Sequence, residues 1–152
     1  MEPFQPYASV AVALAAGLLI GLEREQSGSV SGNDAAFLGG VRTFPLFALL
    51  GALSVLLAPA VPWLPLLSFT AVAVLAGIAW ADDVKKERDR GLHTEVAALV
   101  TWLIGGLAAA DVVIADFGKR AVVAAGLAVV VTFLLSSKPR LQSLGSKVSR
   151  DD

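Results

Sequence analysis

The chain of 152 residues contains no cysteine, one histidine and one tyrosine. Without cysteine there is no disulfide framework, thiolate metal site or cysteine nucleophile. The only histidine, His93, has no partner at metal-ligand spacing, and we expect it to be solvated in a loop. The sequence also shows no Ser-His-Asp set, phosphate-binding glycine loop or nucleotide-binding fingerprint. We therefore predict a protein that is not an enzyme and has no cofactor.

Charge is scarce as well. Only 16% of the residues are charged, the formal net charge is −1 and the pI is about 5.8. A nucleic-acid-binding protein needs a basic surface, and this composition leaves none of the required size. By contrast, 56% of the residues are hydrophobic and the mean hydropathy is +0.73, above the usual values for a soluble domain. The composition indicates a membrane protein with no nucleic-acid partner.

The apolar residues fall into blocks, and this pattern is typical of helices that face lipid. Three prolines in "APAVPWLP" separate the second block from the third, so these two should form a helical hairpin. Each block is shorter than the roughly 20 residues of a full span, so flanking residues or local bilayer thinning must complete it. We predict an all-α polytopic membrane protein with five transmembrane helices: Tyr7–Leu22, Phe44–Ala58, Leu66–Ala81, Val96–Ala110 and Ala121–Leu135.

The distribution of basic residues predicts the orientation of these helices. Of the 12 Lys and Arg residues, only Lys119 and Arg120 fall on one side of the predicted membrane. Because basic loops stay in the cytoplasm, the N-terminus should lie outside and the C-terminus in the cytoplasm, which requires an odd number of spans. We divide the chain into a membrane domain over residues 1–137 and a basic cytoplasmic tail over 138–152. The segment "DVVIADFGKR" forms a loop after helix four or, alternatively, extends that helix through Asp111.

The first apolar block ends in "GLEREQ", where Glu23, Arg24 and Glu25 follow one another. Arg24 could simply contact anionic headgroups, but carboxylates gain nothing from those headgroups and are costly near hydrocarbon. Partners at the same depth are available at the starts of helices two and four, in "VRTFP" and "LHTEV". Thr43 is the expected N-cap of helix two. We predict a polar cluster at the cytoplasmic helix ends, formed by Glu23, Arg24, Arg42, Thr43, Thr94 and Glu95.

Two interpretations of this cluster stay open at the level of sequence. The charges could form a structural network that only fixes helix packing. Alternatively, Glu95 could line an ion or proton path, as acids inside membrane helices often do, although a glutamate in the first turn is also stabilised by the helix macrodipole. No calcium-loop spacing is present, and the sequence leaves the identity of any bound metal unknown.

Small residues recur at helical spacing and predict close helix contacts. Gly17 and Gly21 form a GxxxG pair in the first block, and Gly106 pairs with Ala110 in the fourth. Gly105 ends a row of small and weakly polar residues that begins at Thr94. Such a row suits either close packing or a narrow polar path. We predict that Gly17, Gly21, Gly105 and Gly106 lie at helix interfaces.

Three segments, "GLLIGLERE", "VRTFPLFALLGAL" and "GLHTEVAALVTWLIGGLA", resemble the MgtC/SapB membrane family, in particular the branch whose longer members carry a second membrane domain of unknown function. The resemblance covers about residues 8–137. Transferred position by position, the family pattern falls on residues already chosen on physical grounds: Gly21, Glu23, Arg24, Arg42, Thr43, Thr94 and Glu95.

The resemblance implies a bacterial inner-membrane protein. For the virulence-associated branch it implies a role in growth at low magnesium and in modulating other membrane proteins. The chain shows neither the soluble C-terminal domain of that branch nor the second membrane half of the longer members. We expect a regulatory or partner-binding protein linked to magnesium homeostasis, or alternatively a small oligomeric channel or transporter. The expected partners are the lipid bilayer, further copies in a homodimer or higher oligomer, another membrane protein, and a cation such as magnesium.

Overall fold

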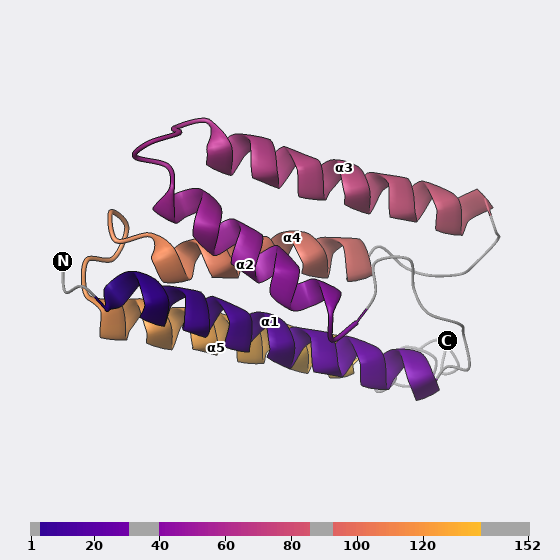
Figure 1. The fold of residues 1–152 in the computed structure, drawn as a ribbon. Coiled ribbons are helices and arrows are strands. Elements are labelled where there is room, and N and C mark those ends of the chain that lie inside the picture. The colour runs from indigo at the N-terminus through magenta and orange to yellow at the C-terminus, as the bar shows by residue number, and fades with distance from the viewer. Residues whose placement is uncertain (1–3, 31–39, 86–92, 138–152) are drawn as a thin grey trace, which may run out of the picture.

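The structure is a computed structural model, and it describes residues 4–30, 40–85 and 93–137. The basic tail predicted at 138–152 lies outside the described residues. Within them the chain forms five α-helices and no strand. Figure 1 shows these helices, which run in alternating directions along one bundle: α1 (Gln5–Val30), α2 (Thr43–Leu56), α3 (Leu64–Lys85), α4 (His93–Ala109) and α5 (Phe117–Ser136).

Each helix contains most of the apolar block predicted for it, and the differences lie at the ends. Helix α1 continues well past Leu22, because Glu, Arg and Gln are good helix formers and the Ser27 hydroxyl bonds Glu23 one turn back, at 2.7 Å. Helix α2 begins with Thr43 as its first helical residue, so the prediction of Thr43 as N-cap was wrong. The N-cap is Arg42, and the Gly40 carbonyl accepts from the N–H groups of Thr43 and Phe44, which leaves little need for a side-chain cap.

The structure shows where helix four ends, which the sequence left open. Helix α4 stops at Ala109, a turn follows at Asp111–Val113, and α5 begins at Phe117. The Asp116 carboxylate caps α5 by accepting from the Lys119 N–H at 2.8 Å. The alternative in which helix four extends through Asp111 is therefore wrong, because this N-cap starts a new helix.

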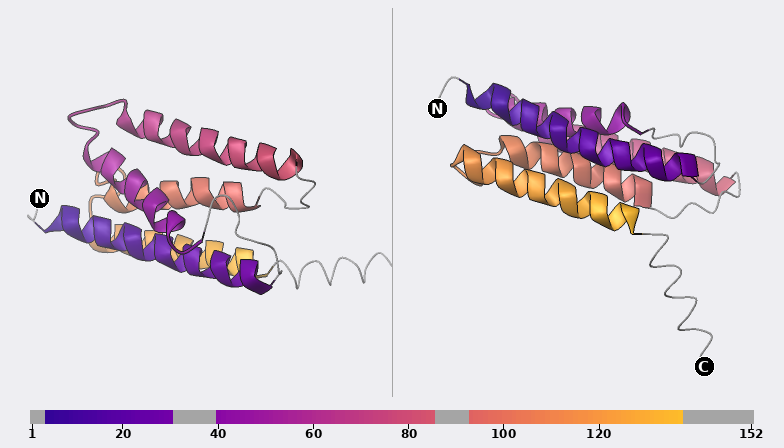
Figure 2. Two further views of the ribbon diagram at one scale, coloured as in Figure 1. Left: turned by 45° about the vertical axis from the view of Figure 1, so that its right-hand side comes forward. Right: turned by 90° about the horizontal axis from the view of Figure 1, so that it is seen from below.

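Helix α4 occupies the centre of the bundle. It packs against all four other described helices, with α3 on the side of α2 and α5 on the side of α1. In the left view of Figure 2, α3 lies at the top of the bundle, and α1 lies at the bottom in front of α5. The polar ends of α1, α2 and α4 are thereby brought to one end of the bundle, where α1 and α3 finish and α2 and α4 begin. We call this the polar end.

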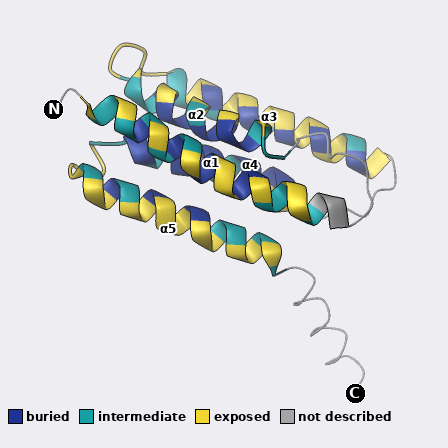
Figure 3. Cartoon of the chain, turned by 60° about the horizontal axis from the view of Figure 1, so that its bottom comes forward, coloured by how far each residue is buried: buried dark blue, intermediate teal, exposed yellow. Residues whose placement is uncertain are grey.

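The interior of the bundle is built from small side chains. One core cluster joins alanines of α1, α2, α4 and α5, including Ala13, Ala48 and Ala124, with the larger Ile20 and Phe44. Large apolar side chains face outward, as on α5, where Val122, Phe133 and Leu134 are exposed (Figure 3). Small residues inside with large apolar residues outside is the arrangement expected when lipid surrounds the helices.

Three of the described helices, α1, α3 and α5, are long and apolar enough to cross a membrane. Helices α2 and α4 are apolar but shorter, at 14 and 17 residues. The fold is thus that of an all-helical protein with at least three segments of membrane-spanning character.

Candidate functional site

At the polar end, a side-chain hydrogen bond joins α1 to α4. The Arg24 Nη2 group donates to the Thr94 hydroxyl, which lies in the first turn of α4 and is buried. These two residues are 70 positions apart in the sequence. A hydrogen bond from a charged donor is among the stronger kinds, so this contact fixes how the end of α1 meets the start of α4.

The polar end also ties α1 to the residues just before α2. The Glu25 Oε2 atom accepts a hydrogen bond from the Val41 N–H at 3.1 Å. One turn earlier on α1, a Cβ on Gly21 would lie only 3.0 Å from the Gly40 carbonyl oxygen. The absence of a side chain at Gly21 therefore allows the backbone before α2 to rest on α1, where Glu25 binds it.

Glu25 was not among the residues predicted for the cluster. The sequence does indicate its position, because Gly17, Gly21 and Glu25 follow at four-residue spacing and so lie on one face of a continuous helix. Because the predicted helix ended at Leu22, Glu25 was not aligned with the two glycines in the prediction. Glu23 instead accepts locally from the Ser27 hydroxyl on its own helix.

Arg42 and Thr43 lie beside this junction but contribute differently from the prediction. Arg42 is exposed at the N-cap of α2, and within the described residues it has no hydrogen bond or ion pair. Thr43 is half-buried as the first residue of α2. The structure thus brings Arg24 and Thr94 into contact and leaves the Arg42 guanidinium facing outward.

Glu95 is the most unusual residue of the polar end. Its side chain is only 8% exposed, and its Oε2 atom has no hydrogen-bond partner among the described residues. Its place in the first turn of α4 lets the positive end of the helix dipole stabilise a carboxylate, but that effect is worth only about 0.3–1 kcal/mol at exposed sites. A buried acceptor without a partner is rare in native proteins and requires an explanation.

Glycines bring the backbones of α1, α2 and α4 into direct contact next to this site. A Cβ on Gly17 would lie 2.6 Å from the Pro45 Cα, and one on Gly105 would lie 1.9 Å from the Ala48 carbonyl oxygen. Gly106 is less confined, with the Val55 Cγ2 atom at 3.4 Å. At Gly51, which was not among the predicted glycines, an added Cβ would lie 2.1 Å from the Trp102 carbonyl oxygen. We call this set of contacts the glycine seam.

At the opposite end of the bundle the structure reveals a buried arginine that the sequence analysis used only for charge counting. Arg120 is 2% exposed, and its Nη1 group donates to the carbonyl oxygens of Ile114 at 2.6 Å and Ala115 at 3.3 Å. Its guanidinium also lies over the Phe117 ring, 5.9 Å from the centroid. Arg120 therefore holds the loop between α4 and α5 in place.

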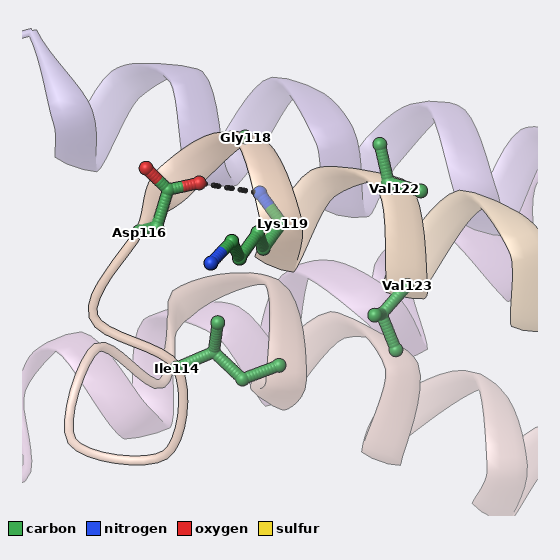
Figure 4. Close-up of a pocket in the computed structure, with 6 residues that line it drawn as sticks. All are labelled: Ile114, Asp116, Gly118, Lys119, Val122 and Val123. Atoms are coloured by element: carbon green, nitrogen blue, oxygen red, sulfur yellow. Dashed lines mark hydrogen bonds between the residues drawn. The ribbon is translucent and has the colours of Figure 1, made fainter.

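An open depression of about 600 Å³ lies at that same end, on the outer side of α5. Figure 4 shows the residues that line it, with the Asp116 carboxylate bound to the Lys119 backbone. Its other polar side chain, Lys119, is exposed, and the walls are the apolar Ile114, Val122 and Val123. The depression brings together no set of polar side chains comparable to the polar end.

The Arg24–Thr94 contact leads to a first prediction. Replacing Thr94 with valine keeps the shape of the side chain but removes the hydrogen bond to the guanidinium, and we expect a loss of about 2 kcal/mol in the free energy of unfolding. SDS titration of the protein in detergent, followed by circular dichroism, measures this. Thr70→Val is the matched control, because the exposed Thr70 hydroxyl only bonds its own helix at Leu66. Equal stability of the two variants would contradict the assignment.

Taken together, the fold and the polar end define a multi-pass helical membrane protein with an internal polar site at one end of its bundle. The MgtC family model matches residues 10–144, which is most of the chain. The chain therefore belongs to the MgtC family. No curated protein and no solved structure gave a significant match.

Proposed function

We propose that the chain crosses the bacterial inner membrane five times, with its N-terminus outside and its C-terminus in the cytoplasm. Three helices have the required length and composition, and α2 and α4 lie between them in the same bundle. At about 1.5 Å per residue, α2 is roughly 21 Å long, shorter than a hydrocarbon core of about 30 Å, so the bilayer thins around it or flanking residues complete the span. The alternating helix directions support this topology. So does the sequence, in which ten of the 12 Lys and Arg residues fall in segments predicted to be cytoplasmic.

We further propose that the protein is not an enzyme but a regulatory membrane protein linked to magnesium homeostasis, and that the polar end is its partner-binding site. Membership of the MgtC family supports the link to magnesium. The observation that carries the regulatory assignment is the glycine seam. Where the Gly105 and Ala48 backbones touch, α2 and α4 leave no width for an ion path between them.

The polar end offers groups that suit a partner. Arg42 presents an exposed guanidinium, which can bind a carboxylate of another protein through two parallel hydrogen bonds. Next to Arg42, the Val41–Glu25 hydrogen bond ties the start of α2 to α1, and the Arg24–Thr94 hydrogen bond ties α1 to α4. These bonds hold in place the backbone that carries the guanidinium. The large apolar side chains exposed on α3 and α5 suit contact with lipid, with further copies of the chain in a homo-oligomer, or with another membrane protein.

Growth at limiting magnesium tests the regulatory proposal. In a strain that depends on this protein under those conditions, Glu95→Gln should reduce the growth rate to that of cells without the protein, at equal abundance in the membrane. Asp111→Asn is the matched control, because it removes the same charge from a half-buried residue in the turn after α4. We expect this control to grow like the wild type.

A second candidate function rests on Glu95 alone. A buried carboxylate oxygen without a partner is also what an ion or proton path would require. Flux measurements on reconstituted liposomes separate the two proposals. The regulatory proposal predicts no flux of cations, anions or protons, whereas a flux that Glu95→Gln abolishes in a folded protein would establish the path instead.

A further inference from the structure

The depression at the start of α5 adjoins an apolar groove between α1 and α5. These two helices pack side by side and begin at the same end of the bundle (Figure 1). The groove has a volume of about 410 Å³. Its lining residues lie between positions 12 and 19 of α1 and between positions 121 and 129 of α5, and every one of them is Ala, Val or Leu. Val122 lines both the depression and the groove, so the two join into one site.

The dimensions of the groove fit a hydrocarbon chain. At about 1.5 Å per residue, its wall on α5 is roughly 12 Å long, close to the depth of one leaflet in a hydrocarbon core about 30 Å thick. A volume of about 410 Å³ spread over this length is much narrower than a helix, whose diameter with side chains is about 10 Å. The groove therefore favours an acyl chain over a helix of another protein.

The depression at the head of the groove carries one charged side chain of each sign. Asp116 and Lys119 both line it and both are exposed (Figure 4). The Asp116 Oδ1 atom accepts from the Lys119 backbone N–H, but within the described residues no ion pair joins the two side chains. Buried Arg120 holds the loop before them through the Ile114 and Ala115 carbonyls. A carboxylate and an ammonium group thus stand on a fixed loop, and each is free to bind a ligand.

These charges limit the class of lipid that fits. A phosphate accepts hydrogen bonds from the Lys119 ammonium, and a primary ammonium donates to the Asp116 carboxylate. The headgroup of phosphatidylethanolamine carries both groups. Phosphatidylcholine has a quaternary ammonium without an N–H, and phosphatidylglycerol has no cation, so its negative charge would face the carboxylate. The pair of side chains is therefore complementary to phosphatidylethanolamine.

We propose that α1 and α5 bind one phosphatidylethanolamine molecule, with its phosphate on Lys119, its ammonium on Asp116 and an acyl chain in the groove. The site lies at the end of the bundle opposite the polar end, and it does not depend on the regulatory function proposed above. Among the described helices α5 packs only against α1 and α4. A lipid that contacts both α1 and α5 should therefore stabilise the folded bundle.

Native mass spectrometry of the delipidated protein in detergent provides the test. Wild-type protein should bind phosphatidylethanolamine more tightly than phosphatidylcholine or phosphatidylglycerol with the same acyl chains. Lys119→Gln should weaken this binding about fivefold. Lys85→Gln is the matched control and should leave it unchanged, because it removes the same charge from an exposed residue at the other end of the bundle. Asp116→Asn should abolish the headgroup preference without disturbing α5, since asparagine caps a helix as well as aspartate does.

A substitution in the groove tests the position of the acyl chain. Ala125→Leu fills the groove and should weaken the binding of all three lipids, whereas Ala71→Leu, at an exposed position on α3, should not. Equal binding of the three lipids by the wild type would overturn the proposal, as would a headgroup preference that survives Asp116→Asn. A dimer that dissociates in Ala125→Leu regardless of lipid would show that the groove holds a second copy of the chain instead.

Discussion

Gly105→Ala is expected to cause one of the largest losses of stability in this protein. A methyl group at position 105 would lie 1.9 Å from the Ala48 carbonyl oxygen, far inside van der Waals contact. The clash is with backbone, which no side-chain rotation can relieve, so α2 and α4 must separate. Overpacking of a core usually costs 1–3 kcal/mol, and we expect about 3 kcal/mol or more here because the contact lies between two helix backbones.

Gly126→Ala is the matched control for this prediction. Position 126 lies in the middle of α5, and apart from the helix's own backbone no heavy atom lies within 4 Å of the added methyl group. Because alanine favours the helix over glycine by up to about 1 kcal/mol, this variant should be as stable as the wild type or slightly more stable. SDS titration followed by circular dichroism measures both variants. If Gly105→Ala unfolded at the same SDS fraction as Gly126→Ala, the glycine seam would be wrong.

Arg120→Ala is expected to destabilise the opposite end of the bundle by about 3 kcal/mol, the range found when a large buried side chain is truncated. The change removes the two hydrogen bonds to the Ile114 and Ala115 carbonyls, and it leaves a space where the 98% buried side chain lay. The loop that separates α4 from α5 then loses its internal support. We expect α5 to detach from the bundle at lower denaturant than the other helices do.

The neighbouring basic residue supplies the control. Lys119→Ala removes the same charge from an exposed side chain, whose backbone N–H still caps α5 through Asp116, so its effect should stay within about 0.5 kcal/mol. Arg120→Lys should fall between the two, because an ammonium group cannot reproduce the geometry of the guanidinium. Hydrogen exchange of the α5 amides distinguishes local detachment from global unfolding. Equal protection of α5 in Arg120→Ala and Lys119→Ala would show that Arg120 does not hold the loop.

Hydrophobic patterning was sufficient to locate all five helices, because each apolar block is long and is bounded by charges, glycines or prolines. The helix ends were harder to predict. The end of α1 is set by intrinsic helix propensity and the Ser27–Glu23 bond, neither of which changes the hydropathy. Similarly, the Gly40 carbonyl accepts the N–H groups at the start of α2, in place of the side-chain cap expected from Thr43. The position of that carbonyl depends on the packing of α1 against the residues before α2, which the sequence does not show.

The candidate site shows the same limit. Equivalent depth in the membrane was enough to place Arg24 near Thr94, but depth says nothing about the direction in which a side chain points. Arg42 lies at the predicted level and yet faces outward. Arg120 appeared to be an ordinary loop charge, because its burial depends on the turn that carries its acceptors, Ile114 and Ala115, and this turn is not visible in the residue pattern.

The polar end combines a rigid support with a buried carboxylate, Glu95, that the support does not pair. The Arg24–Thr94 bond and the glycine seam hold α1, α2 and α4 together, whereas Glu95 retains an unpaired oxygen within the described structure. A buried acceptor without a partner requires an explanation, and we propose a regulatory role for Glu95 beside the structural role of the Arg24–Thr94 bond.

Growth of cells at limiting magnesium with Glu95→Gln in place of the wild type tests this assignment most directly. The substitution keeps the size of the side chain, removes the charge and replaces one carboxylate oxygen with an amide NH₂ group. We expect growth no better than without the protein, at wild-type abundance in the membrane and with wild-type growth of the Asp111→Asn control. Wild-type growth of Glu95→Gln cells would contradict it.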